Sequence, residues 1–368
     1  MANYDIYRPE FMLAVIREKK PLFTFFKDRY FQPDAASVFK TEKVLVDYED
    51  GAGSILAPFV LPTLGAEPMT RDGYETRELT PPYIAISMPL TAYDLQLRQA
   101  GESIVSTLTP EQREQAQLVR DMEALDKAIT RREEWMCVQT MLDNACTMKH
   151  IGDNGDKGKD LVARYYDGNK NPGVFKPTTA WAGSADEHTP GSWYKGVCAQ
   201  LRDMRAAGRN ATDLIVGANI ADMILEDKWA WKRLDIRRSE LGEIDPRWQE
   251  NGVTRIGKLN FGGHDLEIFT YEGTYEEQDP KTRIKTTKSY FPADGALLAA
   301  PKTGKLAYGA VTQMEKDEKF HTRTGTRVPK YDADVKHNTK EAMLTARPIA
   351  IPTVKSPWRA CRNVKSTT

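Results

Sequence analysis

The longest regular pattern in the sequence is helical and begins at Thr109. The segment 109–112, Thr-Pro-Glu-Gln, combines an N-cap hydroxyl, a proline at the first helical position and a glutamine at the third, which is a capping box. Apolar residues then recur at near-helical spacing with no intervening Gly or Pro, at Leu118, Met122, Leu125, Ile129, Met136, Met141 and Ala145. The pattern predicts one helix over 110–146, about 55 Å long. Its heptads are too irregular for a coiled coil, so we expect it to lie across a sheet.

Residues 37–90 carry an extended pattern instead. Residues 39–46 alternate in the manner of a strand, 55–61 is an apolar run broken by Pro58, and Gly and Pro recur at strand-like spacing. This stretch has few places to bury an apolar face within itself. We therefore expect a long hairpin that lies on something outside itself.

An aromatic cluster marks residues 1–36, which read as an arm rather than a domain. Within nine positions the sequence places Phe23, Phe25, Phe26, Tyr30 and Phe31. Two interpretations stay open at this point. The cluster is either a short amphipathic helix packed on its own core, or an arm whose aromatic side chains dock on a neighbouring subunit, because aromatic anchors dominate interface energetics.

The rest of the chain mixes short helices with separated strands. A second capped helix is expected from Thr189 to Gly208, then a buried strand at 214–217 and a helix at 219–227. Strands at 265–271 and 283–291 are expected to form a hairpin around the acidic segment 276–279. The basic segment 281–288 follows, so this hairpin is held either by its own salt bridges or by an electrostatic contact with another subunit. The fold class is α+β.

Composition narrows the function. The 368 residues contain 52 Lys and Arg against 52 Asp and Glu, and this balance argues against a dedicated nucleic-acid binder. The N-terminus shows no secretory signal, and no apolar run is long enough to span a membrane. Cys137 and Cys146, expected on opposite faces of one helix, are too far apart for a disulfide, and Cys198 and Cys361 are isolated. Reduced thiols in a cytoplasm are expected.

A search for catalytic motifs finds none. Gly158-Lys159 fails the phosphate-loop spacing, Gly51-Ala52-Gly53 fails the dinucleotide fingerprint, and the five histidines are scattered rather than at zinc-ligand spacing. No Gly-x-Ser-x-Gly elbow occurs. We therefore expect no catalytic residue, no metal and no cofactor.

Several segments, taken in order, resemble a known family. Phe25-Phe26-Lys27-Asp28-Arg29-Tyr30, then Thr41-Glu42-Lys43-Val44 and Leu56-Ala57-Pro58-Phe59-Val60, are similar to the opening of the phage lambda major head protein family. Residues 71–83, from Arg71-Asp72-Gly73-Tyr74 to Thr80-Pro81-Pro82-Tyr83, resemble that family's arginine- and glycine-containing segment. The clear match covers about residues 22–146, and weaker similarity returns at 290–309 and 344–348. Residues 150–285 differ too much from the family to be aligned residue by residue.

The resemblance implies the tailed-phage major capsid fold. It suggests an N-terminal arm at 1–36, an extended β-hairpin loop at 37–90, a peripheral domain at 91–210 that includes the long spine helix, an axial domain at about 211–310, and a return to the peripheral domain at 311–368. The helix at 189–208 would accompany the peripheral domain. The expected subunit-interface residues are Phe25, Phe26, Tyr30, Phe31, Ile55, Phe59, Arg71, Tyr74, Arg77 and Tyr83.

The implied function is that of a major capsid protein that self-assembles, as hexamers and pentamers, into the icosahedral head of a tailed bacteriophage. The implied partners are scaffold, portal and decoration proteins, with weak contact to packaged double-stranded DNA and none to a membrane. Such a protein is assembled in the host bacterial cytoplasm and ends in the virion. The nearest alternative is an encapsulin-type compartment of the same fold around a cargo enzyme. A cytoplasmic enzyme is the alternative from another class, and it requires 37–90 to pack on its own chain.

Overall fold

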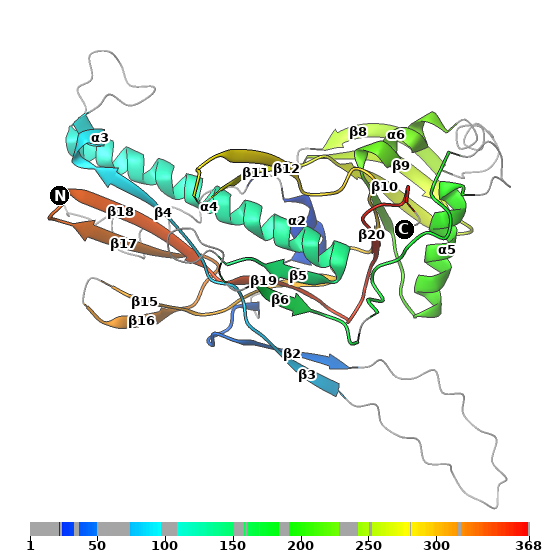
Figure 1. Ribbon diagram of the computed structural model, residues 1–368, viewed down its shortest axis with the longest axis horizontal. Coiled ribbons are helices and arrows are strands. Elements are labelled where there is room, and N and C mark those ends of the chain that lie inside the picture. The colour runs from blue at the N-terminus through cyan, green and yellow to red at the C-terminus, as the bar shows by residue number, and fades with distance from the viewer. Residues whose placement is uncertain are drawn as a thin grey trace, which may run out of the picture.

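Helix α4 (Pro110–Asp143) is the longest element in the described part of the chain, and the other layers are arranged along it (Figure 1). The computed structural model describes residues 22, 24–32, 37–49, 74–96, 109–150, 158, 160–168, 170–183, 191–227, 242–249, 252–279, 281–315 and 318–366. The helix begins as the sequence predicts, because the Thr109 side chain accepts from the Gln112 backbone N–H and the Gln112 side chain accepts from the Thr109 N–H.

The end of α4 differs from the prediction. The helix stops at Asp143 rather than at 146, because Asn144 adopts a left-handed conformation with φ 48°. Asn is one of the few residues that tolerate this conformation at a helix end. The chain then enters β5 (Ala145–Met148), which pairs with β6 (Leu161–Arg164), so Cys146 lies on a strand and not on the helix. All four cysteines are free.

One side of α4 packs on a sheet. Within the described ranges this sheet has three strands in the order β17 (Val328–Asp334), β18 (Thr339–Ala346) and β4 (Ile84–Thr91), and the short helix α3 (Ala92–Gln96) follows β4. The predicted apolar face of α4 is buried here against alternate strand residues: Leu118, Met122, Leu125 and Ile129 against Ala342, Leu344 and Ala346. Strand β4 therefore belongs to this sheet and not to the hairpin that we expected over 37–90.

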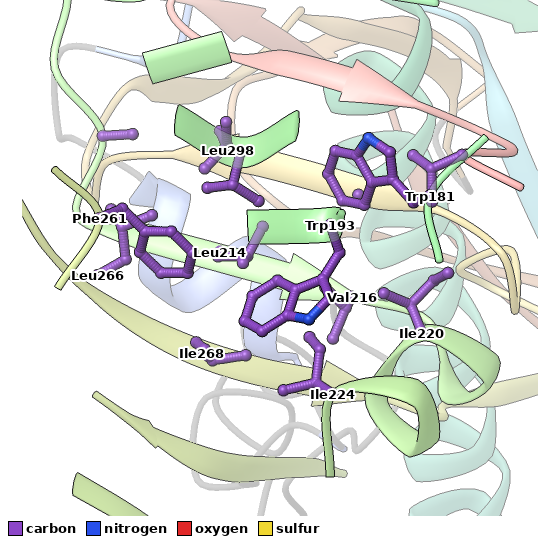
Figure 2. Close-up of a cluster of buried hydrophobic side chains, with 14 of the residues drawn as sticks. Trp181, Trp193, Leu214, Val216, Ile220, Ile224, Phe261, Leu266, Ile268 and Leu298 are labelled. Atoms are coloured by element: carbon purple, nitrogen blue, oxygen red, sulfur yellow. The ribbon is translucent and has the colours of Figure 1, made fainter. Parts of the chain in front are cut away.

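A second sheet lies toward one end of α4, and its strands β7 (Asp213–Val216) and β10 (Asp265–Tyr271) share a buried core with Val138 and Met141 of the helix (Figure 1). In the part of the chain that is described, this sheet runs β20 (Arg359–Cys361), β13 (Ala296–Ala299), β7, β10, β9 (Val253–Asn260) and β8 (Gly242–Gln249). Helices α5 (Trp193–Ala206) and α6 (Ala218–Glu226) pack on it. Figure 2 shows Trp193 among Leu214, Val216 and Ile268.

Two assignments made from the sequence are corrected here. Helix α5 was expected to accompany the domain of α4, but Trp193, Val197, Leu201 and Met204 bury their side chains in the core of the six-stranded sheet. The expected partner of 283–291 was also wrong. Strand β10 pairs with β7 and β9, and the hairpin is formed by β11 (Thr274–Gln278) and β12 (Lys285–Ser289).

The remaining strands form a three-stranded sheet and two projecting pairs. Strand β14 (Gly304–Tyr308) lies between β1 (Phe31–Gln32) and β19 (Pro348–Pro352). Two further antiparallel pairs extend away from the body, β15 (Val311–Met314) with β16 (Phe320–Arg323), and β2 (Val44–Glu49) with β3 (Tyr74–Leu79) (Figure 1). Strands β2 and β3 thus pair within 37–90, and residues 50–73 between them lie outside the described part.

Candidate functional site

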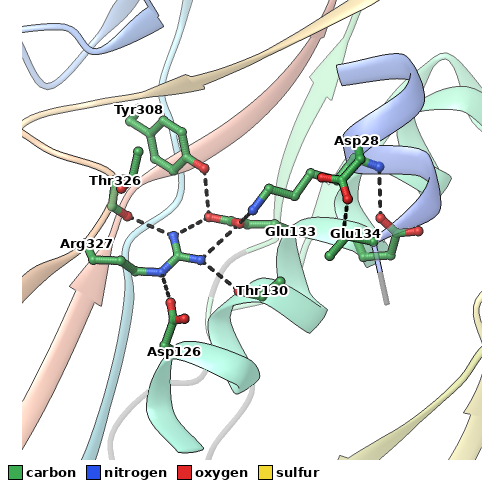
Figure 3. Close-up of polar contacts among 10 residues, drawn as sticks. Asp28, Asp126, Thr130, Glu133, Glu134, Tyr308, Thr326 and Arg327 are labelled. Carbon is green, nitrogen blue, oxygen red and sulfur yellow. Dashed lines mark hydrogen bonds and ion pairs between the residues drawn. The ribbon is translucent and has the colours of Figure 1, made fainter. Parts of the chain in front are cut away.

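The buried face of α4 carries a network of charged side chains. Arg327, from the segment just before β17, reaches α4 and donates from Nε to Asp126 Oδ1 (2.7 Å), from Nη1 to Glu133 Oε1 (2.5 Å) and from Nη2 to Thr130 Oγ1 (3.1 Å) (Figure 3). The side chains of Arg327 and Glu133 are 7% and 0% exposed. The guanidinium therefore fills its donor sites with acceptors from successive turns of one helix and with the Thr326 backbone carbonyl, at 2.8 Å from Nη1.

Glu133 joins three separate segments. Besides Arg327, it accepts from Lys27 Nζ at 2.6 Å and from the Tyr308 hydroxyl at 3.0 Å. Burial by itself would raise the pKa of Glu133, but the positive charges of Arg327 and Lys27 outweigh it and lower the pKa to about 2. The carboxylate is thus ionised, and it ties the N-terminal segment and strand β14 to α4.

Glu134, the next residue, has a different environment. It accepts from the backbone N–H groups of Phe26 and Lys27, both at 2.9 Å, and from the Tyr271 hydroxyl at 3.2 Å. Burial raises its pKa to about 7, because these neutral donors only partly replace water around the charge. Glu134 therefore holds the first turn of helix α2 (Phe25–Tyr30) against α4.

Helix α2 is also fixed to the six-stranded sheet. Arg29 donates from Nε and Nη2 to the two carboxylate oxygens of Asp213 at 2.6 and 2.9 Å, and the Tyr30 hydroxyl donates to the same carboxylate at 2.7 Å. Asp213 is 1% exposed and begins β7. A short helix near the N-terminus is thus anchored to both regions of the subunit by ion pairs with the buried carboxylates of Glu133 and Asp213.

These contacts correct the first group of expected interface residues. Phe25, Phe26, Tyr30 and Phe31 are 4%, 0%, 0% and 0% exposed, and they pack in the chain's own core with residues of α4, β10 and β14. The expectation that they dock on a neighbouring subunit is wrong, because no surface of these rings is left to cover. The alternative interpretation, a short helix packed on its own core, is confirmed.

The second group lies on or near the β2–β3 hairpin. Arg77, on β3, pairs with Glu75 at 2.8 Å and with Asp167, and its side chain is 17% exposed. Tyr74 begins the same strand. Tyr83 is 51% exposed, and the Arg347 guanidinium lies 6.0 Å from its ring centre. Ile55, Phe59 and Arg71 lie outside the described residues. The structure thus places Arg77 and Tyr74 three residues apart on one strand, with Arg77 paired inside its own subunit, and a role for this group in subunit contacts stays a prediction.

The hairpin is anchored at its base on one face only. Val44 and Leu79 are buried in a core with Met136 and Ile349, while Leu45, on the other face of β2, is 61% exposed. Lys355 adds ion pairs to Glu75 and Asp167, both at 3.1 Å. The base is therefore held firmly, and the strands project from it with an uncovered face.

Sequence reasoning missed the buried network. One signal was present, because Glu133 lies four residues after Ile129 and three before Met136, on the face that was predicted to be apolar. An acid in that register indicates a buried partner. Its partner Arg327 lies 194 residues away, and no local pattern indicates such a pairing.

Other kinds of site are not indicated by the described residues. Among them, no group of three or more His, Cys, Asp or Glu side chains is placed to hold a metal ion. No helix in the described ranges is long and apolar enough to cross a membrane. The buried acids of α4 already have partners within the chain, cations for Asp126 and Glu133 and neutral donors for Asp121 and Glu134, so their arrangement is structural.

A long helix lying across a sheet, a second domain with its own sheet and a projecting hairpin define a class of protein, the shell subunit of the tailed-phage capsid fold. The solved structure of a putative capsid protein from a prophage of E. coli CFT073 is similar over 96% of this chain and 98% of that one, with a TM-score of 0.61 and 18% identity. Two more distant similarities are to Mycobacterium phage Patience (TM-score 0.47, 10% identity, 98% of this chain and 86% of that one) and to the SrpI encapsulin complex of Synechococcus elongatus PCC 7942 (TM-score 0.42, 7% identity, 94% and 89%).

The family is defined by sequence. The model of the family described as phage major capsid protein E matches residues 10–358. The chain belongs to this family, and the resemblance noted over about residues 22–146 is confirmed. A sequence search of curated proteins found no significant match.

Proposed function

We propose that many copies of this major capsid protein close into an icosahedral shell of hexamers and pentamers, and that the projecting β2–β3 hairpin is the main contact between copies. The observation that carries the proposal is the one-sided anchoring of this hairpin. At its base the side chains of Val44 and Leu79 are buried, whereas that of Leu45 is exposed. Because the apolar residues Ile55 and Phe59 belong to the connection between its strands, a neighbouring subunit is the natural surface to cover them.

In a closed shell, each contact between neighbouring copies can be weak. Repeated weak contacts around a closed assembly add up, so no single contact has to be strong. Tyr83 and Arg77, at the base, are proposed to contact the adjacent copy together with Arg71 and Tyr74. The role is structural rather than catalytic.

The proposed partners follow from shell assembly. A scaffold protein would guide closure in the host bacterial cytoplasm, a portal would occupy one vertex, decoration proteins would bind outside, and double-stranded DNA would fill the virion with weak contacts to the wall. These partners rest on the family to which the chain belongs.

Electron microscopy of the purified protein, expressed with a scaffold protein if one is needed, tests the proposal. Closed shells are the expected result. Shells that enclose a co-purifying enzyme in place of DNA would indicate a compartment of the encapsulin type. A compact monomer at high concentration would contradict the proposal.

A further inference from the structure

The charges of α4 are sorted by sign between Arg120 and Glu134. The buried charges of this stretch are all acids, Asp121, Asp126, Glu133 and Glu134. The cations all stay at the surface, and these are Arg120, Lys127, Arg131 and Arg132. At 100° per residue, Arg120, Lys127 and Arg131 fall within about 40° of one line along the helix. Glu123 is the acid beside this line of cations, and it forms an ion pair with Lys127 at 2.9 Å.

The β11–β12 hairpin extends this surface. It lies beside α4 on the side away from the β17–β18–β4 sheet (Figure 1), and the Tyr290 hydroxyl, just after β12, donates to the Arg131 carbonyl at 3.4 Å. Lys288, followed by Arg132 and Lys149, lowers the pKa of Glu277 on β11, so these side chains share one region. All five residues of β12 are exposed.

Together these residues form what we call the cationic face. It comprises nine cations and four acids, namely Arg120, Lys127, Arg131, Arg132, Lys149, Lys281, Arg283, Lys285 and Lys288 with Glu123, Glu276, Glu277 and Asp279. The chain as a whole has no net charge. The excess on this face is therefore a local feature, and it arises because α4 uses its acids to hold the core together.

We propose that the cationic face binds duplex DNA through the phosphate backbone, and hence that it is the side of the subunit turned toward the packaged genome. The inference rests on the proposed shell function and adds the surface that meets the DNA. Phosphate contacts require cations in an extended array and no base-specific groups. Arg131 and Lys149 are exposed and make no ion pair with any other described residue, so they can reach phosphates without breaking one.

The chemistry of the face favours DNA over a protein partner. Protein interfaces depend on apolar and aromatic anchors at their centre. Trp135, the aromatic residue of this part of α4, is partly buried, and the Arg132 guanidinium lies 5.2 Å from its ring centre. Ile284, at 63% exposed, is the large apolar side chain that the β11–β12 hairpin presents. A surface with one exposed apolar side chain among nine cations suits a polyanion held by charge.

The test measures binding of a short fluorescein-labelled DNA duplex to the unassembled subunit by anisotropy over a range of salt concentrations. The test variant is Arg131→Glu with Lys149→Glu, which removes two exposed cations that lack described ion-pair partners. The matched control is Arg202→Glu with Arg205→Glu, which makes the same charge change at exposed positions of α5. The test variant should bind at least about tenfold more weakly, with a log–log salt slope smaller by about 2, and the control should bind like the wild type.

Three results would overturn the inference. The first is wild-type affinity in the test variant, and the second is an equal loss in the control, which would indicate a response to net charge alone. The third is binding of labelled poly-glutamate to the wild-type subunit with no binding of the duplex, which would make the occupant an acidic protein. Micrographs of the same preparations separate this inference from the shell proposal, because DNA-filled shells with unchanged duplex binding contradict only the inference.

Discussion

Glu133 and Arg327 form a two-point ion pair inside the subunit, with Nη1–Oε1 at 2.5 Å and Nη2–Oε2 at 3.1 Å. Neither side chain is more than 7% exposed. The pair joins the middle of α4 to the start of β17, and Lys27 brings the N-terminal helix to the same carboxylate. One buried acid thus holds together segments from both ends of the chain.

Replacing Arg327 with Met should destabilise the subunit strongly. The change leaves Glu133 with Lys27 as its remaining cation and Asp126 without its cation, and breaking a buried pair in this way typically costs about 3–5 kcal/mol. Urea unfolding of the unassembled subunit measures the loss. The control is Lys43→Met, which removes an ion pair to Glu78 whose side chains are 56% and 51% exposed, and it should leave the midpoint unchanged. Equal midpoints for both variants would show that the buried network contributes little.

The stability of the subunit should fall as pH rises from about 4.5 to 7, through Glu134. Its pKa in the folded chain is about 7, above the ordinary value of 4.5, so the folded state binds the extra proton within this window. Stability is therefore greatest below the window and is reduced by about 3 kcal/mol once pH exceeds the folded pKa. Unfolding midpoints measured across this range test the effect.

The matched variant for this titration is Glu134→Gln. Glutamine keeps one oxygen for the Phe26 or Lys27 backbone N–H but has no proton to lose. The variant should be less stable than the wild type at pH 5, and its decline between pH 5 and 7 should be shallower. Parallel curves for the two proteins would exclude Glu134 as the titrating group.

Local signals in the sequence predicted the elements better than their partners. The capping box at Thr109 and the apolar spacing through Ile129 predicted α4, because both depend on residues a few positions apart. The buried face of α5, which includes Trp193 and Val197, was predicted correctly for the same reason. Its place in the six-stranded sheet did not follow, because nothing within 193–206 specifies which strands it covers.

In the candidate site, too, the sequence predicted local elements but not their distant partners. The hairpin at 37–90 was predicted from alternation and turns, and β2 pairs with β3 as expected. The aromatic cluster was ambiguous, because Phe26 and Tyr30 would look the same in sequence whether a neighbour or the chain itself covered them. The deciding contacts, Glu134 with the Phe26 backbone and Asp213 with Tyr30, span 108 and 183 residues.

Gly217, the residue between β7 and α6, should not tolerate a side chain. A Cβ there would lie 2.2 Å from the Pro292 carbonyl oxygen and 2.3 Å from that of Ala293, and backbone atoms cannot easily move away. Gly217→Ala should cost about 1–3 kcal/mol. Gly183→Ala is the control, because a Cβ at Gly183 meets nothing within 4 Å, and thermal unfolding of both variants should separate them. A stable Gly217→Ala protein would contradict this packing.

Leu45→Asp should leave the subunit folded and impair its assembly. Leu45 is 61% exposed on the free face of β2, so a carboxylate there stays hydrated in the isolated subunit but would be buried beneath a neighbour. Far-UV circular dichroism should match the wild type, and sedimentation should show fewer shells. Leu45→Met, which keeps an apolar side chain, should assemble normally. Undiminished assembly of Leu45→Asp would remove this face from the interface.

Cryo-electron microscopy of assembled particles would show directly what the β2–β3 hairpin contacts. We expect closed shells in which the β2–β3 hairpin of each subunit, including residues 50–73, lies on an adjacent copy, while Phe26 and Tyr30 stay in the core of their own subunit. Particles in which residues 50–73 fold back on their own chain and neighbouring copies meet without the hairpin would contradict this expectation.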